Sequence, residues 1–293
     1  MLMSTVTGCK PVKLALASGK GGTGKTTLST ALALSARGPV WLLDCDVEEP
    51  NCHIFIQPES QRTVPVPVPV PVIDDTKCTG CGACGEICQF NAIVPLGKKT
   101  IVFPELCHSC GGCARVCPSG AITEQDIIVG TLEISTRDHV TFVKGQLDVG
   151  RAMSGPVIKA VKQFASDDHV TVIDCPPGTS CPMIAAVSGV DFVLLVTEPT
   201  PFGLHDLRLA VETVRTLGLP FGVAINRSDA GDDRVETYCR DEDIAVMVRI
   251  PEDRRIAEAY SNGNVLTAAV PEYIPVLQRL IADIQDRVTG RQP

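Results

Sequence analysis

The sequence is poor in aromatic residues, in positive charge and in long apolar runs. Aromatic side chains make up 4% of the 293 residues, which argues against a surface that stacks nucleobases or binds partners through aromatic anchors. The formal net charge of −8 argues against a broad interaction with a phosphate backbone, so no nucleic-acid partner is expected. No stretch approaches the roughly 20 apolar residues of a membrane-spanning helix, so stable membrane insertion is not expected.

Cysteine is abundant instead. Fourteen cysteines would indicate disulfides in a small secreted protein, but a chain of this length needs no covalent staples. The first apolar run, residues 12–17, is short and is flanked by lysines rather than by a cleavage-site pattern. We therefore interpret the cysteines as metal ligands in a reducing compartment and expect a cytoplasmic location.

Short apolar segments alternate with helical patterns over most of the chain. The expected strands are residues 12–17, 40–43, 170–173, 192–196, 222–225 and 245–250. The expected helices are residues 26–36, 156–164, 204–217, 252–261 and 273–288. Near-continuous apolar strands that alternate with helices predict an α/β fold with a doubly wound, mostly parallel sheet.

A glycine-rich loop follows the first apolar segment. Residues 19–26, G-K-G-G-T-G-K-T, match G-x-x-x-x-G-K-[ST] between a predicted strand and a predicted helix. Backbone N–H groups of such a loop cradle phosphates, Lys25 would reach the β- and γ-phosphates, and Thr26 would coordinate Mg²⁺. The expected ligands are therefore ATP or ADP with Mg²⁺. The expected nucleotide-binding residues of the loop are Gly19, Gly21, Gly22, Thr23, Gly24, Lys25, Thr26 and Thr27.

Acidic residues follow two of the predicted strands. Asp44 and Asp46 follow one strand and Asp174 follows another. Asp174 is expected to hold Mg²⁺ directly or through water, with Asp44 assisting, and Gly178 would offer its N–H to the γ-phosphate. A lone aspartate at a strand end is also a common helix cap or turn former. Acids on two strands beside a phosphate loop favour the catalytic interpretation.

Lys20 gives the loop a family resemblance. Placed ahead of Gly21 and Gly22, it makes the loop resemble the variant Walker A motif of the MinD/ParA/Mrp ATPases. In that family the extra lysine reaches the partner's phosphates across a nucleotide-sandwich dimer. The resemblance implies the same for Lys20, and hence a homodimer or a heterodimer with a similar ATPase. It also implies that Asp46 polarises the attacking water, so that Lys20, Lys25 and Asp46 are the expected catalytic residues. A solvated surface lysine is the alternative for Lys20.

Two further positions resemble the adenine site of this family. Asn226 lies where an asparagine side chain pairs with the base edge, and Pro251 lies in the adjacent loop. Residues 46–51 and 197–200 resemble the branch of the MinD superfamily that contains a ferredoxin insert. The resemblance implies a P-loop ATPase domain in two parts, residues 1–63 and 129–293.

The segment between these parts begins with an unusual run. Valine and proline alternate without exception from Val64 to Val72. Proline lacks the backbone donor, so a central strand is excluded, and a polyproline II connector or a one-sided edge strand remains. We interpret the run as the stiff entry to a small α+β ferredoxin-like domain inserted at residues 64–128.

The insert contains a repeated cysteine pattern. The spacing C-x₂-C-x₂-C-x₃-C occurs at Cys78, Cys81, Cys84 and Cys88, and again at Cys107, Cys110, Cys113 and Cys117. This is the spacing of bacterial ferredoxins, in which the fourth cysteine of each run ligates the other cluster. One [4Fe–4S] cluster is therefore expected on Cys78, Cys81, Cys84 and Cys117, and a second on Cys107, Cys110, Cys113 and Cys88. Zinc is the alternative, but it prefers two separated C-x₂-C pairs.

Three functions can combine a nucleotide switch with two clusters. In the first, an ATPase that converts ATP and water to ADP and phosphate gates electron transfer to a redox partner. The second is a MinD/ParA-like positioning switch whose clusters sense redox state. The third is a carrier that delivers iron–sulfur clusters or another metal cofactor to a metallocofactor protein. The six remaining cysteines, Cys9, Cys45, Cys52, Cys175, Cys181 and Cys239, receive no functional role.

Overall fold

The computed structural model describes residues 11–151 and 153–290. Cys9 therefore lies outside the described residues. Within them, nine strands form one sheet in the order β11-β10-β9-β1-β8-β2-β7-β6-β3. The pairings from β11 to β7 are all parallel, and β6 pairs antiparallel with both β7 and β3. The predicted α/β fold with a mostly parallel sheet is confirmed.

Six strands of the sheet agree closely with the expected apolar segments: β1 (Val12–Ala17), β2 (Val40–Asp44), β8 (Val170–Asp174), β9 (Phe192–Thr197), β10 (Phe221–Asn226) and β11 (Val246–Ile250). The other three are β3 (Glu59–Ile73), β6 (Ile122–Arg137) and β7 (Val140–Leu147). A separate hairpin consists of β4 (Ile93–Leu96) and β5 (Lys99–Val102). β6 and β7 form an antiparallel hairpin, and neither strand is among those expected from the apolar segments.

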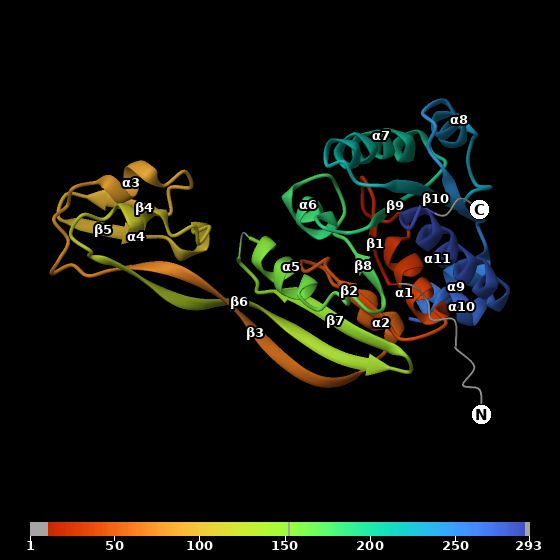
Figure 1. Cartoon of the computed structure of the whole chain (residues 1–293), viewed down its shortest axis with the longest axis horizontal. Coiled ribbons are helices and arrows are strands. Elements are labelled where there is room, and N and C mark those ends of the chain that lie inside the picture. Colours follow the sequence, from red (N-terminus) through yellow and green to blue (C-terminus); the bar gives the residue numbers. More distant parts are fainter. Residues whose placement is uncertain (1–10, 152, 291–293) are drawn as a thin grey trace.

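Helices cover both faces of the sheet, as expected for a doubly wound fold (Figure 1). The first face carries α1 (Lys25–Ser35), α10 (Leu266–Ala269) and α11 (Ile274–Val288). The second face carries α5 (Gly155–Lys162), α6 (Cys181–Val187), α7 (Pro201–Thr216) and α8 (Arg234–Asp241). The remaining helices are α2 (Cys52–Ile56), α3 (Ala83–Ile87), α4 (Gly112–Val116) and α9 (Arg254–Ser261), with 3₁₀ turns at Pro104–Leu106 and Pro271–Tyr273.

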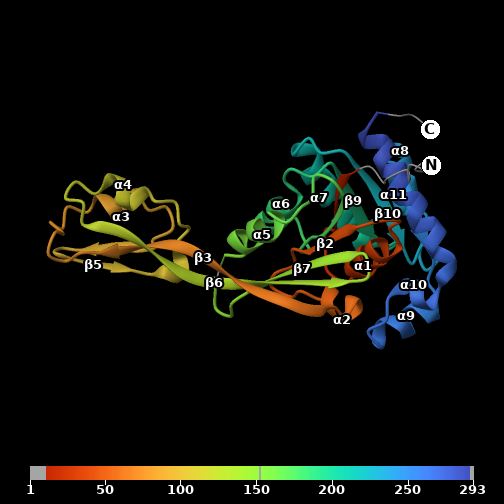
Figure 2. The ribbon, with the colours of Figure 1, turned by 60° about the horizontal axis from the view of Figure 1, so that its bottom comes forward.

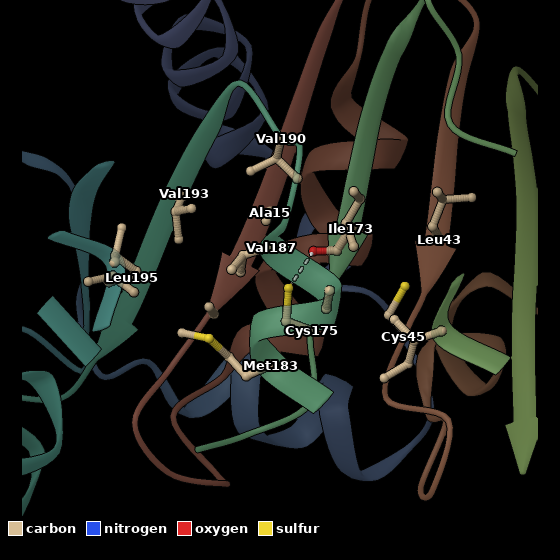
Figure 3. Close-up of a cluster of buried hydrophobic side chains, with 14 of the residues drawn as sticks. Ala15, Leu43, Cys45, Ile173, Cys175, Met183, Val187, Val190, Val193 and Leu195 are labelled. Atoms are coloured by element: carbon tan, nitrogen blue, oxygen red, sulfur yellow. Dashed lines mark hydrogen bonds between the residues drawn. The ribbon is translucent and has the colours of Figure 1, made fainter. Parts of the chain in front are cut away.

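Side-chain alternation along β1 explains the two apolar cores. Leu14 and Leu16 are fully buried against the first face, and Ala15 is fully buried against the second. Figure 3 shows the second core, in which Met183 and Val187 of α6 belong to the same buried cluster as Ile173 of β8. Burial on both faces keeps the central strands, and the loops at their carboxyl ends, in fixed positions.

β3 and β6 extend beyond the body of the protein as a two-stranded ribbon. β6 pairs with β7 only from Gly130 onward, whereas β3 and β6 stay paired as far as Ile73 and Ile122. Figures 1 and 2 show the twisted ribbon carrying a small unit, residues 74–121, away from the helix-covered body of the protein. Both strands run unbroken through the limits predicted for the insert, 63/64 and 128/129.

The valine–proline run is the outermost strand of the sheet. It pairs with β6 on one side and has no neighbour on the other among the described residues. In an antiparallel pair, alternate residues direct their N–H groups toward the neighbouring strand. The valines therefore supply the donors to β6, and the prolines leave the free edge without donors. Of the two conformations that the sequence allowed, the edge strand is the one formed, and its proline edge opposes further strand pairing.

The sequence repeat has a matching backbone repeat in the small unit. Helices α3 and α4 occupy equivalent positions 29 residues apart, because Ala83 corresponds to Gly112. Ile73 pairs with Ile122, and the equivalent pair joins Val102 to Ile93. The two halves are thus related by an approximate twofold exchange.

No helix in the described part of the chain is long and apolar enough to cross a membrane.

Candidate functional site

The glycine-rich loop connects β1 to α1. Lys25, the first residue of α1, is buried, and its Nζ donates a hydrogen bond to Ser18 Oγ at 2.9 Å. Gly24 has a φ of 93° and so takes the left-handed conformation that glycine adopts readily. A Cβ atom there would collide with Asn226 Nδ2, which donates to the Thr23 carbonyl at 3.0 Å. Glycine at position 24 therefore permits both the turn and the approach of Asn226.

Two of the predicted magnesium ligands meet beside this loop because β2 and β8 are neighbours. Asp44 and Asp174 are register partners at the carboxyl ends of these strands, and both are buried. Asp174 accepts hydrogen bonds from Thr26 Oγ1 at 2.7 Å and from Ser29 Oγ at 2.9 Å. Asp46 is partly buried, and its N–H donates to Asp44 Oδ1 at 3.3 Å. The three acids and Thr26 thus occupy one edge of the sheet.

Burial raises the pKa of all three acids, and repulsion from neighbouring carboxylates adds to the shift at Asp44 and Asp46. Burial, followed by repulsion from Asp174, raises the pKa of Asp44 well above its usual value. Burial also raises the pKa of Asp174, although the Thr26 hydrogen bond and Lys25 oppose this shift. Burial, followed by Asp174, raises the pKa of Asp46 to about 7. A divalent cation favours the charged carboxylates, so Thr26, Asp44 and Asp174 fit a bound Mg²⁺.

The other predicted nucleotide residues lie around the same edge. Gly178 has a φ of 91°, and its N–H donates to the Ser18 carbonyl at 2.9 Å. This N–H becomes available to a γ-phosphate only when that bond opens. Lys20 is half-buried, and Pro251 directly follows β11, whose last residue is the register partner of Asn226. Loop residues Gly19, Gly21 and Gly22 precede α1, and Thr26 and Thr27 lie in its first turn.

The eight predicted cluster cysteines line two cavities in the small unit. One cavity is lined by Cys78, Cys81, Cys84 and Cys117. The other is lined by Cys88, Cys107, Cys110 and Cys113. We call them cavity one and cavity two. Each takes three cysteines from one run and the fourth cysteine from the other run.

The thiols are spaced more widely than in a structural zinc site. A tetrahedral zinc ion with Zn–S bonds of about 2.3 Å brings its sulfur ligands to within about 3.8 Å of one another. Within residues 11–151 and 153–290, no three of these cysteines place their Sγ atoms within 4.8 Å of one another. The side chains therefore fit a metal centre larger than a single zinc ion.

Comparisons with known proteins agree with the geometry of the nucleotide site. Residues 14–266 match the family described as the CobQ/CobB/MinD/ParA nucleotide binding domain. The chain belongs to this family. A relative, protein MJ0578 of Methanocaldococcus jannaschii, is 34% identical over 222 residues, which cover 74% of this chain and 78% of the relative. The Pyrococcus abyssi protein named iron-sulfur cluster carrier protein is 22% identical, covering 94% of this chain and 87% of its own length.

Solved structures show the same fold for this MinD/ParA-type ATPase. The septum site-determining protein MinD of Pyrococcus horikoshii, complexed with Mg-ADP, superimposes with a TM-score of 0.58 at 20% identity. The match covers 96% of this chain and 99% of the MinD chain. The identity is low, so the likeness establishes the fold alone.

Sequence reasoning missed three side chains of the MinD/ParA-type site. Ser18 accepts a hydrogen bond from Lys25, and Ser29 donates one to Asp174. Cys52 Sγ lies 3.5 Å from Asp174 Oδ2. Ser29 could have been found, because it lies one turn after Thr26 on the same helix face. Cys52 could not, because α2 has five residues and gives no periodic signal that would place it.

Asn226→Ala is expected to weaken ATP binding about tenfold. The substitution removes the hydrogen bond to the Thr23 carbonyl, and an unsatisfied buried acceptor costs about 1–3 kcal/mol. Titration with a fluorescent ADP analogue and competition with ATP would measure the change. Asn262→Ala is the matched control, since its Nδ2 donates to the Glu258 carbonyl in exposed α9. If the two variants bound ATP with equal affinity, the assignment of Asn226 to the nucleotide site would be wrong.

Proposed function

We propose that this MinD/ParA-type ATPase is a nucleotide-switched dimer that couples ATP turnover to electron transfer through two [4Fe–4S] clusters to a redox partner. The sorting of the eight cysteines into two mixed cavities carries the proposal, because it matches the crossed ligation of two-cluster ferredoxins. When bound, each cluster supplies a one-electron carrier. Cys81 and Cys110 are exposed, so each cavity has a ligand at the surface of the small unit.

In the body, the chain's own residues bind and position the nucleotide. Lys25 and the loop N–H groups neutralise and orient the phosphates, while Thr26 and Asp174 hold Mg²⁺. Asp46 holds the attacking water against the γ-phosphate. Lys20, from the facing protomer, completes the phosphate site, so that hydrolysis requires the dimer.

Backbone hydrogen bonds connect the nucleotide site to the ribbon. Val47, next to Asp46, accepts a hydrogen bond from the Leu147 N–H at 2.9 Å. The following residue, Asp148, donates from its N–H to the Val129 carbonyl, also at 2.9 Å. Val129 lies where β6 leaves the body for the ribbon. A shift of Asp46 during hydrolysis is therefore transmitted to the base of the ribbon that carries the cysteines.

The test is nucleotide-dependent electron delivery. Anaerobically purified protein, reduced with dithionite and freed of excess reductant, is mixed with a one-electron acceptor protein. The rate is then measured with Mg-ATP, with Mg-ADP and without nucleotide. We expect Mg-ATP to change the rate and Lys20→Ala to remove that dependence. Equal rates under all three conditions contradict the proposal, as does protein without iron and acid-labile sulfide.

Cluster delivery is the second candidate function. It is favoured by the name of the Pyrococcus abyssi relative, an iron-sulfur cluster carrier protein, and by the exposure of Cys81 and Cys110. A carrier transfers its clusters to an apo-ferredoxin in the presence of a chelator, whereas an electron carrier retains them. Iron analysis of both proteins after separation distinguishes the two functions.

The two cavities differ in the groups around their thiols. At cavity one, Ser119 Oγ lies 3.6 Å from Cys117 Sγ and Thr100 Oγ1 lies 3.8 Å from Cys78 Sγ. At cavity two, one such contact is found among the described residues, from the Ser109 N–H to Cys107 Sγ at 3.4 Å. The position equivalent to Ser119 at cavity two, 29 residues earlier, is Phe90, which stacks on His108 with ring centroids 3.4 Å apart. Hydrogen bonds to ligating sulfur raise the reduction potential of a cluster. We therefore expect the cluster in cavity one to be reduced first.

Ser119→Ala is expected to lower the potential of the first-reduced cluster by roughly 40 mV. This value is a hydrogen bond of about 1 kcal/mol converted for one electron. Redox titration monitored by electron paramagnetic resonance should show one shifted wave and one unchanged wave. Ser188→Ala, which removes a hydroxyl bonded to the Ile184 carbonyl in the body, is the control. A shift of both waves, or of neither, would contradict the assignment.

A further inference from the structure

A thiol lies between the two buried acids of the nucleotide site. Cys52 is fully buried at the start of α2, and its backbone N–H donates to Asp44 Oδ2 at 3.0 Å. Its Sγ lies 3.5 Å from Asp174 Oδ2. One ligand atom each of Asp44, Cys52 and Asp174 lie within 4.8 Å of one another. No other group of three metal-ligating side chains in residues 11–151 and 153–290 meets this spacing.

We propose that Asp44, Cys52 and Asp174 bind a thiophilic divalent cation, such as Zn²⁺, in the nucleotide-free protein. The cation competes with Mg-ATP and so links metal availability to the nucleotide cycle. Cys52 gives up its thiol proton to solvent on binding and becomes the third protein ligand. The proposal concerns the nucleotide site alone and does not depend on the clusters.

The donor set suits a metal other than Mg²⁺. Mg²⁺ prefers six oxygen ligands and retains several waters, so a thiolate adds nothing to its binding. One thiolate and two carboxylates with an open fourth position suit Zn²⁺ and similar ions. In a tetrahedral zinc site, Zn–S of about 2.3 Å and Zn–O of about 2.0 Å place sulfur and oxygen about 3.5 Å apart. The Cys52–Asp174 separation has this value.

The charge balance of the site favours a cation at this position. The carboxylates of Asp44 and Asp174 are at most 1% exposed, so water screens their repulsion poorly. The nearby ammonium group of Lys25 is hydrogen-bonded to Ser18 Oγ instead of to either acid. A divalent cation between the acids and Cys52 would offset the repulsion directly.

Competition with Mg-ATP follows from a shared ligand. Asp174 Oδ2 accepts the hydrogen bond from Thr26 Oγ1 at 2.7 Å and is also the oxygen nearest Cys52 Sγ. The nucleotide's Mg²⁺ requires Thr26 and Asp174, whereas the thiophilic cation draws Asp174 toward Cys52. Each cation must therefore weaken the binding of the other by the same factor.

Cys52 also packs in the apolar core beneath α1, and packing alone would explain a small buried side chain there. The two explanations predict different metal binding. The full-length, cluster-loaded protein is titrated anaerobically with Zn²⁺ by calorimetry in Mg²⁺-free buffer. We expect one tight site that Cys52→Ala lacks. Cys239→Ala, which removes another buried thiol from α8, should retain it. Unchanged zinc binding in Cys52→Ala would overturn the proposal.

Two further measurements keep the test decisive if Cys52→Ala folds poorly. Zinc-edge X-ray absorption of wild-type protein loaded with one equivalent should show one sulfur and the remainder oxygen or nitrogen. Four sulfur ligands around the zinc, or none, would contradict the proposed site. Saturating Mg-ATP should weaken zinc binding at least tenfold. If zinc bound equally tightly with and without Mg-ATP, the proposed competition between the two would be wrong. A protein that bound zinc but did not transfer electrons would contradict the proposed function and not the zinc site.

Discussion

Asp174→Asn is expected to reduce ATP hydrolysis at least 100-fold without lowering the stability of the nucleotide-free protein. The carboxylate accepts hydrogen bonds from Thr26 and Ser29 and is the best-placed acid to hold Mg²⁺ beside the phosphate loop. Loss of a single group that stabilises charge in a buried active site typically costs about 10²–10³ in rate. Asparagine keeps the shape of the aspartate side chain and one acceptor oxygen, but it has no charge to neutralise Mg²⁺.

The stability expected of the Asp174→Asn variant has a separate physical cause. Burial raises the pKa of Asp174, which means that the folded protein disfavours its ionised form. The amide that replaces the carboxylate carries no charge, so the variant avoids this penalty near neutral pH. Thermal unfolding in chelator should give a melting temperature equal to or above that of the wild type. Such a gain is typical of sites that retain destabilising groups for function.

A matched variant makes the result specific. Asp283→Asn removes an exposed carboxylate of α11 that forms an ion pair of 3.9 Å with Arg279 and lies far from the phosphate loop in sequence. It should change neither phosphate release nor melting temperature. If Asp174→Asn hydrolysed ATP at the wild-type rate, the assignment of Asp174 as a magnesium ligand would be wrong.

The sequence predicted the central sheet well because its strands are buried on both faces. β1, for example, coincides with the predicted residues 12–17. Such strands are continuous apolar runs whose ends are marked by the phosphate loop and by the acids. Short or polar helices gave no comparable signal. α2 has five residues and α6 has seven, too few for a helical period to repeat.

The ribbon was predicted less completely because its conformation depends on a distant partner. The valine–proline run allows both polyproline II and an edge strand, and pairing with β6 decides between them. β6 is exposed on both faces along part of its length, so its sequence lacks the alternation that marks a half-buried strand. The position of Cys52 likewise depends on the turn that follows Asp46, which the spacing of residues does not fix.

Crossed ligation predicts a difference between two double variants that each remove two cysteines. Cys78→Ala with Cys117→Ala removes two ligands from cavity one and leaves cavity two complete. Cys78→Ala with Cys88→Ala removes one ligand from each cavity. We expect the first variant to retain about half of the wild-type iron and the second to lose most of it, because a cubane cluster with three thiolate ligands is held less firmly than one with four.

Ligation within each run would give the opposite result. Cys78 and Cys88 would then share one cluster, so the second variant would keep half of the iron and the first would lose both clusters. Iron and sulfide analysis after anaerobic purification separates these outcomes. Because metal binding contributes folding free energy to small metal-binding units, loss of both clusters should also expose residues 74–121 to proteolysis. The body should remain protected and continue to hydrolyse ATP, since its core is built from the nine-stranded sheet and the helices on its two faces.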